Sequence, residues 1–217
     1  MLLSPFQHGG VADISGLHAL SKEYPRALSI ILAYTPSFKI YSEEEYHHLL
    51  KKISLEIDTT TSAISAFLKA VGIKHFLVPQ GGQDPETLLA KFPHKLAATR
   101  AGLGWIGKNS LLVTSKYGPR VRLATLLIDS DFPCGEPVNV PKCGECMACV
   151  EACPYAYIKG KNWYPGMQRN DLLNAHLCSA EREAYRSIIG HKHECGFCLL
   201  VCPFGNVTGK VTIEKAG

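Results

Sequence analysis

The cysteines of this 217-residue chain are confined to one stretch of the sequence. None occurs in residues 1–133, and all nine lie between Cys134 and Cys202. A chain of this length buries roughly 70% of the surface that its unfolded form exposes, so it needs no cross-links to fold. The cysteines therefore indicate chemistry at a specific site.

Their spacing is typical of ferredoxins that hold 4Fe-4S clusters. The first run, C-x-x-C-x-x-C-x-x-x-C-P, consists of Cys143, Cys146, Cys149, Cys153 and Pro154. In such a run three thiolates bind one cluster and the fourth binds a second cluster. The second run, C-x-x-C-x-x-x-C-P, contains Cys195, Cys198 and Cys202, and Cys178 lies upstream of it.

Exchange of the last cysteine of each run between two clusters uses eight of the nine cysteines. One predicted ligand set is Cys143, Cys146, Cys149 and Cys202, and the other is Cys153, Cys178, Cys195 and Cys198. Structural zinc in C-x-x-C pairs is the alternative, but it leaves the C-x-x-x-C-P endings unexplained. Cys134 has no partner at a suitable spacing, and we interpret it as a bystander thiol.

Charge and hydropathy exclude several classes of protein. The formal net charge of +4 is small and evenly spread, so it does not by itself indicate nucleic-acid binding. The longest apolar stretch, near residues 27–34, is far shorter than the roughly 18 residues that suggest a membrane span. The N-terminus lacks the basic region of a secretory signal, and reduced thiols suit the cytoplasm, where we expect this protein.

Local patterns predict alternating strands and helices before the cysteines. A helix should begin near Ser42, where Ser42 and Glu45 form a capping box, and end at Gly72, with a kink allowed around residues 59–62. The other expected elements are strands at 27–34 and 73–78, helices at 84–92 and 94–101, and an antiparallel hairpin of 110–114 with 121–129.

A glycine-rich segment, Gly102 to Gly107, matches the pattern G-x-G-x-x-G. It follows a helical segment and leads into a strand, whereas the dinucleotide-binding fingerprint follows a strand and opens a helix, so we do not expect a nicotinamide site. The glycines allow a positive φ or the close approach of a bulky group. Two interpretations stay open: a ligand-contacting loop, or a tight turn packed against the cluster segment.

The run AGLGWIGKN at residues 101–109, the strand ending at Asp129, the eight-cysteine tail and the isolated Cys178 together resemble the epoxyqueuosine reductase family. That family is itself similar to the reductive dehalogenases. The resemblance implies an α+β fold. A nitroreductase-like α/β domain at residues 1–133 would precede a ferredoxin-like double-cluster domain at 134–217.

The resemblance also implies a function. Members pass low-potential electrons through two 4Fe-4S clusters to a base-off cobalamin, which carries out reductive chemistry. A ferredoxin or flavodoxin would supply the electrons, and a small molecule or a modified nucleoside would be the substrate. The implied cobalamin contacts are Gly102, Gly104, Trp105, Ile106, Gly107, Lys108, Asn109, Arg122, Leu123 and Ala124. Arg120 and Lys108 would meet its phosphate or amide groups.

Three departures from the family pattern matter. Leu88 stands where the tRNA-modifying enzymes carry a proton-donating aspartate, so Tyr34, Tyr41, Asp84 and Glu86 become the candidate donors. The segment after Cys178 reads Ser-Ala-Glu-Arg in place of the usual Ser-Tyr-Leu stretch. The third departure is that C-terminal helical repeats are missing, which disfavours tRNA as a partner. Two alternatives to a cobalamin reductase follow: a ferredoxin-like electron-transfer partner without its own catalysis, and a flavin protein.

Overall fold

The computed structural model describes residues 8–34 and 41–205. The chain forms two compact units whose segments interleave along the sequence. Unit 1 comprises Met1–Ala33, Ile53–Gly104 and Val121–Val138, and unit 2 comprises Tyr34–Lys52, Trp105–Arg120 and Asn139–Gly217. These units differ from the linear division at residue 133 that the sequence suggests, and that domain division stays a prediction.

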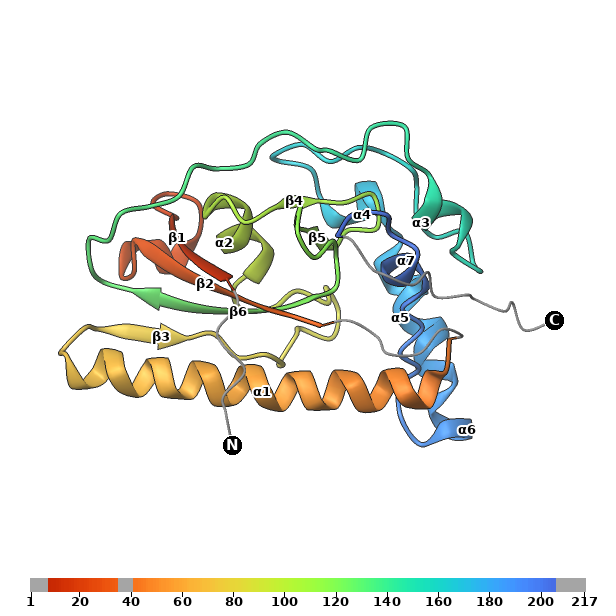
Figure 1. Ribbon diagram of the computed structural model, residues 1–217, viewed down its shortest axis with the longest axis horizontal. Coiled ribbons are helices and arrows are strands. Elements are labelled where there is room, and N and C mark those ends of the chain that lie inside the picture. The colour runs from red at the N-terminus through yellow and green to blue at the C-terminus, as the bar shows by residue number, and fades with distance from the viewer. Residues whose placement is uncertain (1–7, 35–40, 206–217) are drawn as a thin grey trace. The chain divides into compact units, whose positions relative to one another are not determined.

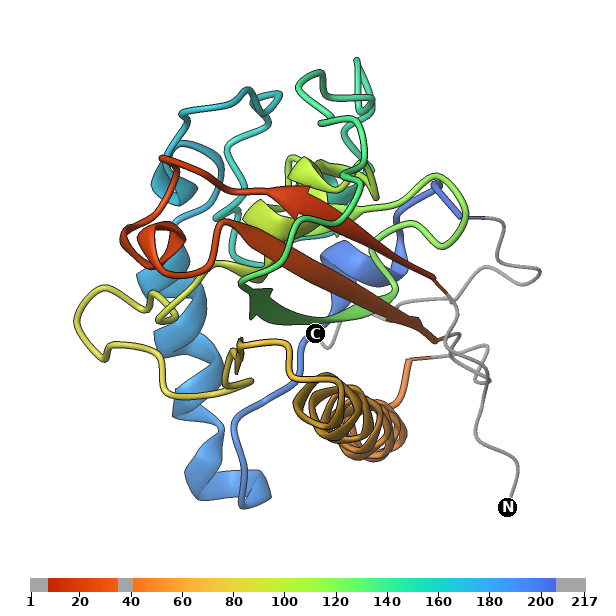
Figure 2. The same ribbon diagram turned by 90° about the vertical axis from the view of Figure 1, so that its left-hand side faces the viewer.

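Unit 1 is built on a four-stranded antiparallel sheet (Figures 1 and 2). Its strands are β1 (His8–Asp13), β2 (Arg26–Ala33), β3 (His75–Leu77) and β6 (Val121–Ile128), in the order β1-β2-β6-β3. In the central pair, Ala27 lies opposite Leu127 and Ser29 opposite Thr125. Both central strands are buried along most of their length, as expected for continuous apolar runs.

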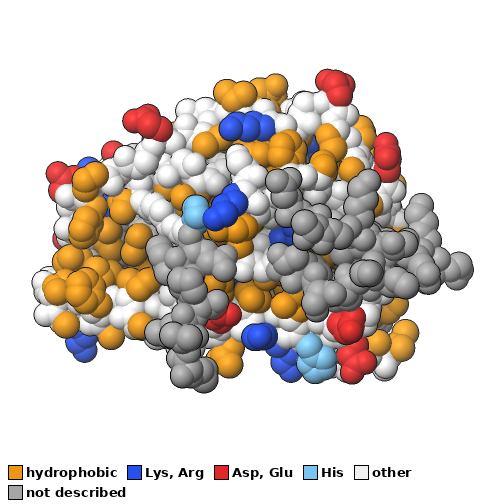
Figure 3. All heavy atoms as spheres, in the orientation of Figure 1, with side chains coloured by type: hydrophobic (Ala, Val, Ile, Leu, Met, Phe, Trp, Pro, Cys, Tyr) orange, Lys and Arg blue, Asp and Glu red, His pale blue; other side chains and the backbone are white. Residues whose placement is uncertain are grey.

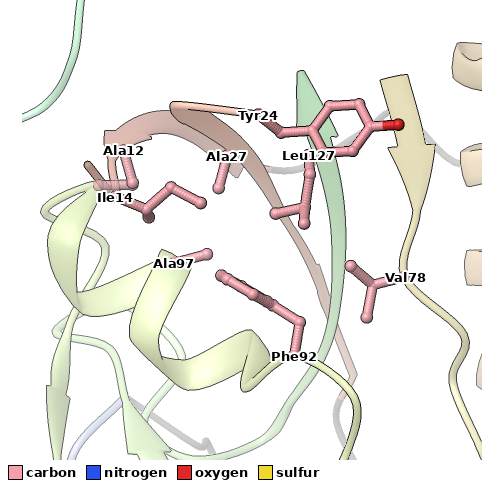
Figure 4. Packing of buried hydrophobic residues seen from close by; sticks show 9 residues of the cluster. Ala12, Ile14, Tyr24, Ala27, Val78, Phe92, Ala97 and Leu127 are labelled. Carbon is pink, nitrogen blue, oxygen red and sulfur yellow. The ribbon is translucent and has the colours of Figure 1, made fainter. Parts of the chain in front are cut away.

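Helix α2 (His94–Arg100) packs on one face of this sheet. Figure 4 shows Ala97 of α2 facing Ala27 and Leu127 from the strands, with Phe92 beside it. A short 3-10 helix, η1 (Ala19–Lys22), joins β1 to β2 and contributes Leu20 to the edge of the same core. This apolar core holds unit 1 together.

Helix α1 (Glu43–Ala70) is continuous over 28 residues, and no kink occurs. The threonines in its middle are accommodated within the helix, where their hydroxyl groups donate to main-chain carbonyls one turn back. These bonds join Thr59 to Leu55, Thr60 to Glu56 and Thr61 to Ile57 at 2.8–2.9 Å. The C-terminal part of α1 runs beside β3 (Figure 1), where Ser65 Oγ lies 2.7 Å from His75 Nε2.

Unit 2 consists of short elements. A two-stranded ribbon pairs β4 (Trp105–Ile106) with β5 (Leu112–Val113). The cysteine segment contains α3 (Ala148–Glu151), α4 (Arg169–Leu172), α5 (Ala175–Ala184), α6 (Arg186–Ile189) and α7 (Phe197–Leu200). Only α5 among these helices is longer than four residues.

The structure confirms several sequence predictions and contradicts two. The strand at 27–34, the long helix, the strand near 75 and the helix at 94–101 are present. The helix predicted at 84–92 is wrong: Asp84 Oδ1 accepts hydrogen bonds from the Thr87 N–H and hydroxyl, which close a turn instead. The predicted hairpin is also wrong, because β5 pairs with β4 while β6 pairs with β2 and β3.

The mixed helix-and-strand fold is therefore confirmed at the level of its class. In the described part of the chain, no helix combines the length and hydrophobicity needed to cross a membrane. The face in Figure 3 carries basic and acidic side chains scattered among hydrophobic ones, without a patch of one sign among its described residues. That distribution agrees with the small net charge.

Candidate iron–sulfur cluster sites

A cavity lies within unit 2 and is bounded by four cysteines. They are Cys143, Cys146, Cys149 and Cys202, the members of one predicted ligand set. Gly107, Lys108, Asn109, Val113, Pro203 and Phe204 complete its wall. The structure thus brings a cysteine of the second run to three cysteines of the first.

Local turns present these sulfurs. The Cys146 N–H donates to the Cys143 carbonyl at 3.0 Å, which closes a turn around Gly144, and Gly144 has a positive φ of 52°. Cys149 lies on α3, Cys198 lies on α7, and α3 packs against α7. Cys202 follows α7 after one turn, so the two short helices bring the two cysteine runs together.

Burial and mutual repulsion raise the pKa of the clustered thiols. Burial, followed by the neighbouring Cys143, Cys202 and Cys146, raises the pKa of Cys149 to about 11. The pKa of Cys202 is raised by burial, with Cys143 and Cys146 adding to the effect and Arg120 opposing it. Cysteine thiols must lose their protons to bind metal, so metal binding at such a group of thiols releases protons.

The other four cysteines influence one another in the same manner. Burial first, then Cys195, raises the pKa of Cys198, with smaller effects from Cys149, Cys178 and Cys153. The pKa of Cys195 is raised by burial and then by Cys178 and Cys153. Cys178 lies on α5. Cys149, which belongs to the first group of four cysteines, also raises the pKa of Cys198, which belongs to the second group.

The cysteines are not gathered around a single point. In residues 8–34 and 41–205, no three His, Cys, Asp or Glu side chains are close enough to share one metal ion. A tetrahedral zinc site requires such convergence, whereas the four thiolates of a 4Fe-4S cluster each bind a different iron.

The glycine-rich loop belongs to the cysteine cavity. Trp105, 1% exposed, donates from Nε1 to Cys143 Sγ at 3.4 Å, and its ring meets Phe204 edge to face. Asn109 donates from Nδ2 to the Cys198 carbonyl at 2.9 Å. A Cβ on Gly107 would lie 2.7 Å from Asn109 Oδ1, so glycine is required there by close packing. Within unit 2 these contacts match the interpretation of a tight turn packed against the cluster segment.

Arg120 is a structural residue that sequence reasoning assigned to a cofactor phosphate. Its guanidinium is buried and donates to main-chain carbonyls of the segment around Cys202. The acceptors are Leu199 at 3.4 Å, Cys202 at 3.1 Å, Gly205 at 2.6 Å, and Phe204. Main-chain carbonyls leave no mark in a sequence, so no pattern could have indicated this role.

Of the remaining implied cofactor contacts, Ile106 lies in unit 2 and the others lie in unit 1. Gly102 has a φ of 79°, and a Cβ there would lie 2.7 Å from the Glu136 carbonyl oxygen, so this glycine too has a packing role. Ala124 is fully buried in β6, while Arg122 and Leu123 are partly exposed. Arg122 Nε is buried and has no hydrogen-bond partner among the described residues. The structure also places Gly104 and Ile106 as buried parts of the loop.

The candidate proton donors are dispersed. Asp84 and Glu86 lie in an exposed turn of unit 1, and hydrogen bonds from the Thr87 N–H and hydroxyl lower the pKa of Asp84. A carboxyl with a lowered pKa is a poor acid near neutral pH. Tyr34 is buried in unit 2 and its N–H donates to the Arg120 carbonyl at 3.0 Å. Tyr41, also in unit 2, packs edge to face on Phe197.

Comparisons with known proteins agree with this picture. Residues 142–205 match the family described as 4Fe-4S double cluster binding domain. The epoxyqueuosine reductase of Salmonella typhimurium is 37% identical over 108 residues, which are 49% of this chain and 28% of that protein. The epoxyqueuosine reductase of Pseudomonas aeruginosa is 29% identical over 170 residues, 76% of this chain and 44% of that protein.

Solved structures share the fold at low sequence identity. An epoxyqueuosine reductase in complex with an epoxyqueuosine-modified tRNA stem loop aligns with 89% of this chain and 51% of its own length, at a TM-score of 0.55 and 24% identity. A reductive dehalogenase described with a mechanism for B12-dependent dehalogenation aligns with 94% of this chain and 31% of its own length, at a TM-score of 0.70 and 12% identity.

The aligned part spans less than half the length of these two curated relatives. The prediction that tRNA is an unlikely partner is not supported, because one similar structure contains a tRNA stem loop. The cysteine pattern, the double-cluster match and the curated relatives lead to one conclusion: the chain carries a 4Fe-4S double cluster binding segment and is similar to epoxyqueuosine reductases over part of their length.

Proposed function

We propose that this chain is an iron–sulfur reductase that passes low-potential electrons through two 4Fe-4S clusters. One cluster is held by Cys143, Cys146, Cys149 and Cys202, and the other by Cys153, Cys178, Cys195 and Cys198. The observation that carries the proposal is the position of Cys202, which lines the cavity of the first cysteine run although it belongs to the second. That exchange is the ligand pattern of two-cluster ferredoxins.

The chain's own residues set the environment of the first cluster. The Trp105 indole N–H points at Cys143 Sγ, and hydrogen bonds to ligand sulfurs raise reduction potentials. Arg120 fixes the segment around Cys202 through four carbonyls. The α3–α7 contact brings Cys149 and Cys198 near each other and offers a route for an electron between the two ligand sets.

Iron and sulfide analysis of the protein reconstituted without oxygen tests this proposal. Two clusters require about eight irons and eight sulfides per chain. Cys202→Ser should lose the first cluster and about half the iron. Cys134→Ser is the matched control, because Cys134 is exposed and outside both ligand sets, and it should keep all the iron. Stoichiometric zinc, or full iron in Cys202→Ser, would contradict the assignment.

We further propose that the α/β part, which the family resemblance describes as nitroreductase-like, binds a cobalamin that receives the electrons. Cobalamin supplies a redox-active cobalt centre when bound. Arg122 fits such a ligand best, because its buried Nε has no partner among the described residues and amide or phosphate oxygens are suitable acceptors. Trp105 and Asn109 fit less well, since their polar atoms are used on the cluster segment.

Visible spectroscopy during titration of the holoprotein with cobalamin tests this step. Binding at tens of micromolar with a spectral shift supports a cobalamin reductase, and Arg122→Leu should weaken that binding about tenfold. Absence of binding, with both clusters present, favours the second candidate function, an electron-transfer partner of a separate redox protein. The exposed turn that holds Asp84 and Glu86 is the observation that favours this second function, because both acids are open to solvent.

The substrate class follows from the relatives. Curated relatives are named epoxyqueuosine reductases, so a modified nucleoside is the first substrate to test, with a ferredoxin or flavodoxin as electron donor. An assay with a queuosine-precursor tRNA and with the free nucleoside, each with dithionite as reductant, separates tRNA from small-molecule substrates. Turnover of neither under conditions that load both clusters and cobalamin would contradict queuosine chemistry.

A further inference from the structure

Lys108 is a buried cation that has no anionic partner among the residues that the structure describes. It is 4% exposed, and none of the ion pairs found among the described residues includes it. Its ammonium Nζ lies 3.5 Å from Met147 Sδ, and a thioether is only a weak acceptor. Burial of an ammonium group without a counter-charge is strongly unfavourable, so an anion is expected nearby.

The position of Lys108 indicates which anion this is. The residue lines the cavity bounded by Cys143, Cys146, Cys149 and Cys202, within unit 2. A 4Fe-4S core with four thiolate ligands carries a net negative charge, and it would occupy the space on which Lys108 borders. Lys116, in contrast, is exposed and lies over the Tyr117 ring, where solvent stabilises its charge.

We propose that Lys108 is the counter-charge of the first cluster and raises its reduction potential relative to that of the second. The inference rests on the proposed function, because it requires a cluster in this cavity. Reduction adds one electron from an external low-potential donor to the cluster, and no bond forms or breaks. A fixed positive charge at the cavity wall stabilises the reduced, more negative state more than the oxidised state.

An EPR-monitored redox titration of the reconstituted full chain, with dithionite as reductant, tests this role. In Lys108→Met, one of the two couples should move to a lower potential by a tenfold or larger change in its reduction equilibrium, about 59 mV for one electron. The other couple should move less. Lys108→Arg should keep the wild-type potentials, and Lys116→Met, which removes an equal charge at the surface, should leave both couples nearly unchanged.

Iron content separates the outcomes. If Lys108→Met loses the iron of one cluster while Lys108→Arg keeps it, the charge is needed for cluster binding and the proposal is supported. If both variants keep full iron and wild-type potentials, or if both lose the iron equally, Lys108 has only a packing role and the proposal is overturned. A wild-type protein that binds well short of about eight irons after reconstitution would overturn the two-cluster function itself.

Discussion

The two units of this protein are stabilised by different means. Unit 1 buries an apolar core between α2 and a four-stranded sheet, in which Ala12, Ala27, Phe92, Ala97 and Leu127 are fully buried. The cysteine segment of unit 2 has four helices of four residues each, and isolated helices of that length are unstable in water. The groups that its cysteines bind are therefore expected to contribute to its order. The difference suggests that one unit folds by hydrophobic burial and the other by cluster binding.

Removal of the clusters should have the largest effect, confined to unit 2. Structural metal sites contribute on the order of 10 kcal/mol to folding, so chelation of iron should unfold the cysteine segment. Hydrogen exchange read residue by residue should report lost protection in residues 142–205 and preserved protection in β2 and β6. Loss of protection in both units at the same chelator concentration would remove the distinction.

Leu127→Ala should have the next largest effect, on the opposite unit. Leu127 is fully buried between the sheet and α2, and loss of such a side chain costs about 2–5 kcal/mol. Urea unfolding followed by far-UV circular dichroism should report this decrease in the free energy of unfolding. Iron content per folded chain should stay at the wild-type value, and a parallel loss of iron would mean that the two units are energetically coupled.

Arg120→Gln should have a moderate effect on unit 2. Its guanidinium satisfies carbonyls of Leu199, Cys202 and Gly205, and buried acceptors left without donors cost about 1–3 kcal/mol. The first cluster should be lost faster to a chelator, as measured by the decay of visible absorbance. Arg186→Gln, at an exposed ion pair with Glu183, is the matched control and should decay at the wild-type rate.

The smallest expected effect is a pH dependence of unit 1. Burial, opposed by a hydrogen bond that the imidazole donates to the Pro79 carbonyl and aided by the Arg122 charge, lowers the pKa of His94 below 6.5. The unfolded chain then binds more protons than the folded one, so stability is complete above about pH 6.5 and decreases as pH falls toward the folded pKa. The slope is at most about 1.4 kcal/mol per pH unit. Urea unfolding at pH 7 and pH 5 should differ less in His94→Gln, and an unchanged difference would exclude His94 as the source.

The sequence was most informative where spacing is dictated by chemistry. The spacing of the cysteines predicted two groups of four, and the position of Cys202 in the cavity agrees with that prediction. The long helix was predictable because Ser42, Glu45 and Gly72 mark its ends. Strand partners were harder to predict: β6 pairs with β2, about 95 residues away, and not with the nearer β5.

Other features depend on contacts that have no local signal. The edge strand β1 contains Gly9 and Gly10, which weaken any strand pattern, and it was not predicted. The turn at Asp84 was predicted as the start of a helix because aspartate followed by proline is common both at helix N-termini and in turns. The glycine-rich loop matched a nucleotide-binding pattern by letter, but in unit 2 its polar side chains contact the cysteine segment.

The position of Cys202 beside the Cys143 run also constrains when the protein can mature. Cys143 is synthesised 59 residues before Cys202, so the fourth cysteine of the first cavity is absent until residue 202 has been translated. Cluster delivery is therefore expected to be post-translational or very late on the ribosome. Nascent chains stalled before residue 202 would be poor acceptors for the cellular machinery that inserts iron and sulfide.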